Sequence, residues 1–138
     1  MVEDAMVVNT SVLTDKIKGF VDKSVLGGKR FSLIMLIVDQ ELSNTQYTLF
    51  VSATWLDMMS PREAVIEIIS GLEKHLSSNE LSPIERVTVI RSDDEFVKQT
   101  NQYLNRARSK TNVIEVTNYK VAGISIEKAF IIKDSPLN

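Results

Sequence analysis

Three aspartates form the pattern in this chain that most suggests chemistry. Asp57 follows one predicted strand, and Asp93 and Asp94 follow another. Mg²⁺ binds one or two protein carboxylates together with waters and phosphate oxygens, so these residues are a candidate metal site for phosphate or phosphodiester hydrolysis. The competing interpretation is structural, because Asp beside a helix N-terminus caps free backbone N–H groups. No other residues complete an enzyme motif, which favours the structural interpretation.

Four residues in the same two loops are expected to line a ligand pocket beside the aspartates. They are Trp55, Ser60, Arg91 and Ser92. If the two strands are parallel, both loops lie at the same end of the sheet, where open α/β folds bind their ligands. The pocket would take a small phosphate compound, with Mg²⁺ as the only cofactor that the pattern suggests. Trp55, the single tryptophan, would form one wall of it.

Composition removes several other mechanisms. The chain has no cysteine, which excludes disulfides, thiolate metal sites and cysteine nucleophiles. Its single histidine, His75, lies within a predicted helix, and no G-x-S-x-G nucleophile elbow accompanies it. The glycine pair Gly27-Gly28 lacks the spacing of a phosphate-binding loop and follows a predicted helix, so we interpret it as a helix end.

Charge and hydropathy argue against nucleic acid and membrane partners. The 138 residues include 16 basic and 18 acidic side chains, for a net charge of −2. Nucleic-acid-binding domains usually carry a basic excess, so binding through the mildly basic segment 106–138 is the weakest of our hypotheses. The longest apolar run, residues 33–38, is too short to span a bilayer, and the acidic N-terminus does not resemble a secretory signal. We therefore expect a cytoplasmic protein.

The elements that must position these residues follow from hydrophobic periodicity. Three segments repeat apolar side chains every three or four positions, as amphipathic helices do. These segments are residues 12–25, 60–77 and 92–105. Five shorter segments are continuously apolar or alternate in polarity, as strands do. These are residues 31–38, 47–56, 84–90, 113–119 and 124–132.

Two of the predicted helices begin at recognisable capping boxes. Ser60-Pro61-Arg62-Glu63 places a serine three residues before a glutamate, with proline at the first helical position. Ser92-Asp93-Asp94-Glu95 repeats the serine and glutamate spacing at the start of the third helix. Both starts follow a predicted strand directly.

The predicted order α-β-β-α-β-α-β-β indicates an α/β protein, with α+β as the alternative, built on a mixed five-stranded sheet and three helices. Strand 31–38 is nearly all apolar, so we place it at the centre of the sheet with both faces buried. Helical connections before and after strand 84–90 predict parallel strands. If Val121-Ala122 form the turn of the final hairpin, Glu115 lies opposite Lys128. The whole chain is expected to form one domain, with residues 1–9 as a loose leader.

Interaction with another protein is the preferred functional hypothesis. Three helices do not obviously cover both faces of five strands, and an uncovered apolar remainder would be a dimer interface. Candidate interface residues are Met58, Met59, Phe130 and Ile132. The last strand is also a candidate sheet edge for pairing with another chain. We expect a non-catalytic interaction domain, as a homo-oligomer such as a homodimer or as an accessory subunit of a cytoplasmic complex. A Mg²⁺-dependent phosphate binder or hydrolase is the alternative.

Overall fold

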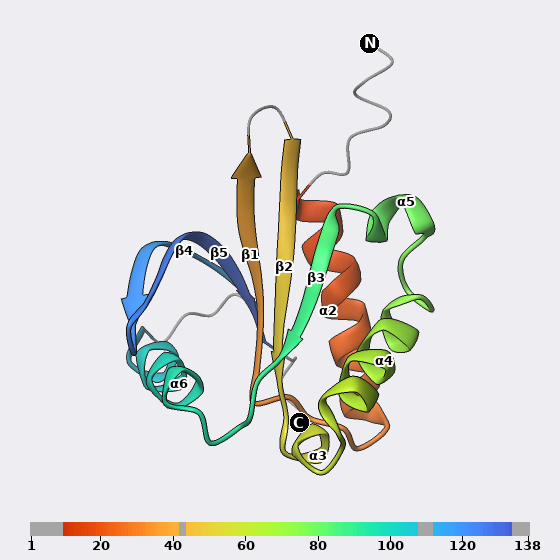
Figure 1. Cartoon of the computed structure of the whole chain (residues 1–138), viewed down its shortest axis with the longest axis horizontal. Coiled ribbons are helices and arrows are strands. Elements are labelled where there is room, and N and C mark those ends of the chain that lie inside the picture. Colours follow the sequence, from red (N-terminus) through yellow and green to blue (C-terminus); the bar gives the residue numbers. More distant parts are fainter. Residues whose placement is uncertain (1–9, 42–43, 108–111, 134–138) are drawn as a thin grey trace.

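The structure, a computed structural model, describes residues 10–41, 44–107 and 112–133 (Figure 1). Its strands are β1 (Leu33–Glu41), β2 (Asn44–Ser52), β3 (Ile84–Val89), β4 (Val113–Val121) and β5 (Ile124–Ile132). Its described helices are α2 (Thr10–Leu26), α3 (Thr54–Asp57), α4 (Pro61–Leu72), α5 (Ser78–Leu81) and α6 (Glu95–Ala107). The α/β class and the mixed five-stranded sheet are confirmed, and the two helices beyond the predicted three, α3 and α5, are single turns. The predicted leader, residues 1–9, lies outside the described residues.

The strand order is β3-β2-β1-β5-β4, so β1 occupies the centre as predicted. Its side chains are buried alternately on the two faces of the sheet, because Ile34 and Leu36 belong to one core and Leu33 and Met35 to the other. β2 is antiparallel to β1 and parallel to β3, which confirms the crossover predicted between β2 and β3.

The second predicted crossover is wrong. β4 pairs antiparallel with β5, and β5 pairs antiparallel with β1, so β3 and β4 are the two opposite edges and run in opposite directions. The helix α6 therefore carries the chain across the whole sheet rather than to a neighbouring parallel strand. The prediction that the last strand is an edge is also wrong, because β5 enters the gap between β1 and β4.

Two hydrophobic cores lie on opposite faces of the sheet. Figure 1 shows the helices that cover these faces, α2 and α4 on one and α6 on the other. The α2–α4 core consists of buried side chains of α2, α3, α4, β1 and β2, joined by Ile132 of β5. The α6 core consists of buried side chains of α6, β1, β4 and β5. The central strand β1 contributes to both, which explains why its sequence is apolar without alternation.

The predicted strand 47–56 ends earlier, at Ser52. Ala53 is extended, and its carbonyl accepts hydrogen bonds from the N–H groups of Leu56 (3.1 Å) and Asp57 (3.2 Å), which close the helical turn α3. Trp55 therefore lies on a helical turn rather than on a strand. The alternation of polar and apolar residues continues through Trp55 and so predicts a longer strand. In the helical turn, however, Leu56 rather than Trp55 is the fully buried residue.

One capping box is confirmed and the other is not. Ser60 and Glu63 exchange two hydrogen bonds of 3.2 Å at the start of α4, as predicted. The predicted helix 60–77 then ends at Leu72, and a capping box between Ser77 and Glu80 starts α5. The predicted box at residues 92–95 does not form, because the Ser92 side chain bonds Asp57 instead.

The final hairpin turns at Ala122-Gly123, one residue later than predicted. Both residues have positive φ angles, 51° and 79°, as the tightest two-residue hairpin turns require. The shifted register places Glu115 opposite Phe130 rather than opposite Lys128. The two charges still approach diagonally, with Lys128 Nζ 3.9 Å from Glu115 Oε2. None of the helices in the described part of the chain is long and apolar enough to cross a membrane.

Candidate functional site

The loops after β2 and β3 do meet at one end of the sheet, as the sequence predicts. Asp57 accepts hydrogen bonds from the backbone N–H of Ser92 at 3.1 and 3.3 Å, and from the Ser92 hydroxyl. This contact joins residues 35 positions apart and fixes α3 against the segment that leads into α6. Asp57 thus has a structural role at the position where a metal ligand was predicted.

The other two aspartates face separate partners. Asp94 accepts a hydrogen bond from the backbone N–H of Phe96 at 2.9 Å and caps α6. Asp93 accepts one from Arg91 Nε at 3.1 Å, and this bond lowers the pKa of Asp93 and raises that of Arg91. Both side chains of that pair are about two-thirds exposed, so the pair contributes little to stability.

The predicted metal ligands therefore do not gather. Within residues 10–41, 44–107 and 112–133, no group of three histidine, cysteine, aspartate or glutamate side chains is placed to hold a metal ion. Of the predicted pocket residues, Ser60 caps α4 and Ser92 bonds Asp57, while Trp55 points away to a different cavity. The physical reason is that each carboxylate has its own hydrogen-bond partner: Asp57 accepts from Ser92, Asp93 from Arg91, and Asp94 from a backbone N–H at the start of α6.

The four predicted interface residues also separate. Ile132 is buried in the α2–α4 core, and Phe130 and Met59 pack half-buried against that core. Only Met58 is fully presented to solvent, with 89% of its surface exposed. Phe130 and Ile132 are covered because β5 lies inside the sheet. The basic segment named in the nucleic-acid hypothesis includes Lys110, which lies outside the described residues.

A cavity of about 320 Å³ opens between α2 and α4, on the face of the sheet that these helices cover. We call it the Trp55 pocket. Aromatic side chains form its apolar part, and three lysines and the single histidine surround it. It is lined by Phe20, Lys23, Ser24, Gly27, Lys29, Trp55, Glu67, Ile68, Gly71, Lys74 and His75.

Two aromatic residues that line the Trp55 pocket, Phe20 and Trp55, belong to one continuous series through Phe31, which itself lines a different cavity. The ring centroids of Phe20 and Phe31 are 5.6 Å apart, and so are those of Phe31 and Trp55. His75 packs edge-on against Phe20 at 6.1 Å. The indole N–H of Trp55 donates to the carbonyl of Arg30 at 2.8 Å, which fixes the orientation of the indole ring.

Lys29 makes a cation–π contact with the indole of Trp55. Its Nζ lies 5.1 Å from the Trp55 ring centroid and 3.3 Å from Glu67 Oε2. The first distance is that of a cation–π contact, and the second joins α4 to the segment that follows α2. About half of each charged side chain is exposed, so this ion pair is weak and readily exchanged.

Gly71 sets the separation of the two helices beside this pocket. A Cβ atom built at Gly71 would lie 2.4 Å from Cε1 of Phe20, closer than any van der Waals contact permits. The glycine therefore allows the Phe20 ring to lie directly on the backbone of α4. The sequence contains a signal of this arrangement, since residues that line the pocket repeat at three or four positions in both segments: Phe20, Ser24 and Gly27 in and just after α2, and Ile68, Gly71 and His75 in and just after α4. The prediction of helices 12–25 and 60–77 did not extend to their mutual contact.

A second, open groove of about 650 Å³ lies between α6 and the edge strand β4. Tyr119 closes its floor, because its ring packs 5.4 Å from Tyr103 and 6.4 Å from Phe96, and its hydroxyl donates to Thr100 at 2.8 Å. Burial raises the pKa of Tyr119 above its usual value. Asn118 has a φ of 50°, and the alternation of side chains shifts by one residue at this position. Val116 and Tyr119, three residues apart, therefore both face the α6 core. The end of the hairpin thus curls onto α6.

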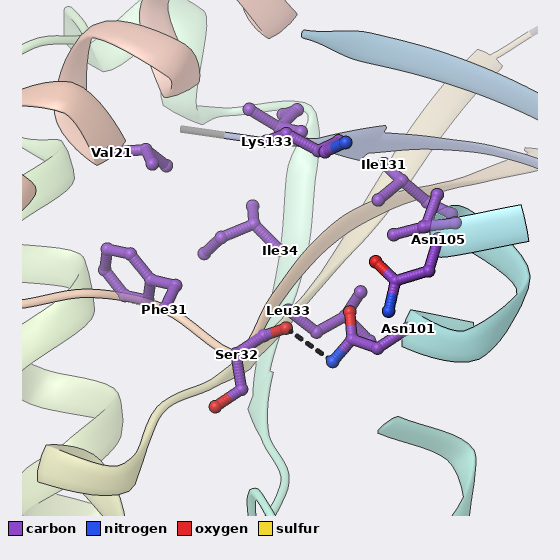
Figure 2. Close-up of a pocket in the computed structure, with 11 residues that line it drawn as sticks. Val21, Phe31, Ser32, Leu33, Ile34, Asn101, Asn105, Ile131 and Lys133 are labelled. Atoms are coloured by element: carbon purple, nitrogen blue, oxygen red, sulfur yellow. Dashed lines mark hydrogen bonds between the residues drawn. The ribbon is translucent and has the colours of Figure 1, made fainter. Parts of the chain in front are cut away.

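A third cavity, of about 140 Å³, lies where β1 begins and β5 ends (Figure 2). In the close-up, Asn101 of α6 points toward Ser32 and donates to its carbonyl at 2.9 Å, while Phe31, Ile34 and Val21 form the opposite wall. The cavity is smaller than the roughly 300 Å³ of typical small-molecule sites. We interpret it as a packing gap between the two cores.

Comparisons of the chain with protein-family models, with curated proteins and with solved structures found no match. The function must therefore be inferred from the geometry of this molecule.

Proposed function

We propose that the protein is a non-catalytic interaction domain that binds an extended segment of a partner protein along the edge of β4. The observation that carries the proposal is the groove between that nine-residue edge strand and α6. Within the described part of the chain, β4 is hydrogen-bonded to a neighbouring strand on one side only. An exposed sheet edge binds a peptide by adding it as a further strand, and an adjoining groove then receives alternate peptide side chains.

The backbone groups available for such pairing follow from the ladder. The N–H of Lys133 donates to the carbonyl of Asn112 at 2.7 Å, so Asn112 directs its backbone toward β5. In an antiparallel pair, successive residues alternate between facing the partner strand and facing away from it. Glu115 and Thr117 follow Asn112 by three and five residues, both odd numbers. Their N–H and C=O groups therefore point away from β5, toward the open edge of the sheet. The partner segment would pair with these two residues.

The α6 side of the groove is polar and adaptable. Gln99, Gln102 and Arg106 line it, together with Tyr103, whose side chain is 39% exposed. Tyrosine and arginine are enriched where proteins bind one another, because each combines a large contact area with hydrogen-bonding groups. A partner side chain entering the groove would therefore meet both an aromatic ring and amide groups.

A foreign segment fits this edge better than a second copy of the chain. Regular pairing along the outer side of β4 ends at Thr117, because Asn118 with its positive φ breaks the alternation of the backbone. A symmetric antiparallel pair centred on Glu115, whose backbone groups face outward, places this residue opposite its own copy, and directly opposed like charges destabilise a sheet. The other edge, β3, is shorter, and its pairing with β2 is irregular at Tyr47/Thr48. We therefore propose a partner with a basic residue opposite Glu115, and an accessory role in a cytoplasmic complex.

The test uses a displayed library of short random peptides selected on the full chain. Replacing Thr117 with proline removes an outward N–H, a change that edge strands tolerate. We expect selected peptides to protect the amides of Glu115 and Thr117 from hydrogen exchange, and Thr117→Pro to weaken their binding about tenfold or more. Thr117→Val, which keeps the N–H and favours a strand, is the matched control and should bind as the wild type does.

Two results would contradict the proposal. One is selection of peptides that bind Thr117→Pro as tightly as the wild type while that variant keeps its circular dichroism spectrum. The other is a dimer, seen by light scattering, that Thr117→Pro dissolves, because the occupant of the edge would then be a second copy.

A further inference from the structure

We infer that the Trp55 pocket is a separate binding site for a small planar organic anion, an aromatic or heteroaromatic ring that carries a phosphate or carboxylate group. The site is independent of the groove between α6 and β4, since its lining residues lie in and around α2 and α4. These two helices are on the face of the sheet opposite α6 (Figure 1). The pocket volume of about 320 Å³ suffices for one small molecule.

The ring-binding part of the site is the aromatic series. Trp55 is half-buried, and its indole N–H is already engaged with the carbonyl of Arg30, so the exposed part of the indole offers a face or an edge rather than a hydrogen bond. Phe20 lines the same pocket, and its ring packs against α4 because Gly71 has no side chain. Planar rings bind such walls in offset or edge-to-face arrangements.

The charged part of the site selects for an anion. Lys23, Lys29 and Lys74 line the pocket against a single acidic residue, Glu67, which gives the lining a net charge of +2 with His75 neutral. The chain as a whole has a net charge of −2, so this local excess is opposite in sign to that of the protein. Within the described residues, Lys23 and Lys74 have no ion-pair partner.

Lys29 connects the two parts. Its ammonium group lies over the Trp55 ring while it contacts Glu67. Because that ion pair is half exposed and weak, an anionic group entering the pocket can replace Glu67 as the partner of Lys29 without loss of the cation–π contact. The ligand ring would then lie beside the indole, with its anionic group toward Lys29 and Lys74.

The single tryptophan supplies a direct readout, because all indole fluorescence of the chain comes from Trp55. The probes are adenosine 5′-monophosphate and 2-naphthoate, with adenosine as the uncharged ring and inorganic phosphate as the anion without a ring. We expect a saturable change of Trp55 emission with at least one of the two charged rings, at a midpoint below about 1 mM. Which of the two binds more tightly distinguishes a phosphate from a carboxylate ligand.

The variant Lys23→Glu/Lys74→Glu reverses the charge of the lining, and we expect it to weaken binding about tenfold or more. Lys98→Glu changes an exposed lysine of α6 on the other face and is the matched control, with binding unchanged. The inference would be overturned if neither charged ring gave saturable binding, or if adenosine bound as tightly as the charged rings. It would also be overturned if the charge-reversed variant bound the charged rings as tightly as the wild type. A parallel calorimetric titration confirms that any change in emission reports binding.

Discussion

The two faces of the sheet are covered by different means. On one face, α2 and α4 pack side by side and bring Phe20 against the backbone at Gly71. On the other face, a single helix, α6, covers β1, β5 and β4, and the end of the hairpin curls up to meet it through Tyr119. Two helices therefore cover one face of the sheet, whereas one helix together with the curled end of the hairpin covers the other.

This difference decides where each face remains open. Two adjacent helices leave space between them, and the Trp55 pocket lies there with its lysines. One helix over three strands leaves space at its flank, and the groove along β4 lies there. The two proposed sites thus arise from two solutions to the same problem of covering a sheet.

The largest expected effect concerns the α6 core. Phe96 is fully buried and packs edge-on against Phe50 and Tyr119, so Phe96→Ala should lower the free energy of unfolding by about 3–5 kcal/mol. Since β1 belongs to both cores, we expect the two faces to unfold together. Urea titrations followed by circular dichroism and by Trp55 fluorescence, which reports the opposite face, should coincide. Separate transitions in the variant would show that the faces are independent units.

A smaller effect tests the close contact of α2 and α4. Gly71→Ala places a methyl group 2.4 Å from the Phe20 ring, and such overpacking costs about 1–3 kcal/mol, more than alanine gains over glycine in a helix. Gly19→Ala is the matched control, because its Cβ would lie 3.7 Å from His75, an ordinary contact. Thermal unfolding should show the first variant destabilised and the second unchanged or stabilised. Equal stability of both would mean that Phe20 moves freely.

The smallest effect concerns the hydroxyl that joins the hairpin to α6. Tyr119→Phe removes the bond to the buried Thr100 and should cost about 1 kcal/mol at neutral pH. Burial raises the pKa of Tyr119, so its contribution is complete below the unfolded tyrosine pKa of about 10 and decreases as the pH rises through the folded value. Urea unfolding at about pH 8 and about pH 10.5 should show a steeper loss for the wild type than for the variant. Parallel losses would contradict this origin.

Much of the fold was accessible from local patterns. The continuous apolar run at the start of β1 correctly predicted a central strand buried on both faces, and Ser60 with Glu63 correctly predicted the start of α4. The predictions were wrong where a residue has more than one available hydrogen-bond partner in the folded chain. Ser92 has the spacing of an N-cap, but in the folded chain Asp57 competes for it, and Asp94 caps α6 instead.

The candidate sites were less accessible than the fold. The aspartates at the strand ends were candidate metal ligands because a carboxylate can either bind a metal ion or cap a helix. The residue type alone does not distinguish these two roles. Trp55 was predicted to line a pocket together with Arg91, whereas in the structure it lines a cavity beside α2 and α4. Lys23 and Lys74 lie in separate predicted helices, and nothing local indicates that these two helices pack together.

By itself, the sequence determined the number of strands, the succession of strands and main helices along the chain, and the burial of the central strand, because these depend on periodicity within a few residues. The tertiary structure alone decided that β5 inserts beside β1, that β4 becomes an edge, and that α2 and α4 meet at Gly71. Those outcomes depend on contacts between residues far apart in the chain, where the fit of side chains and the pairing of backbone groups select one arrangement among several with the same local pattern.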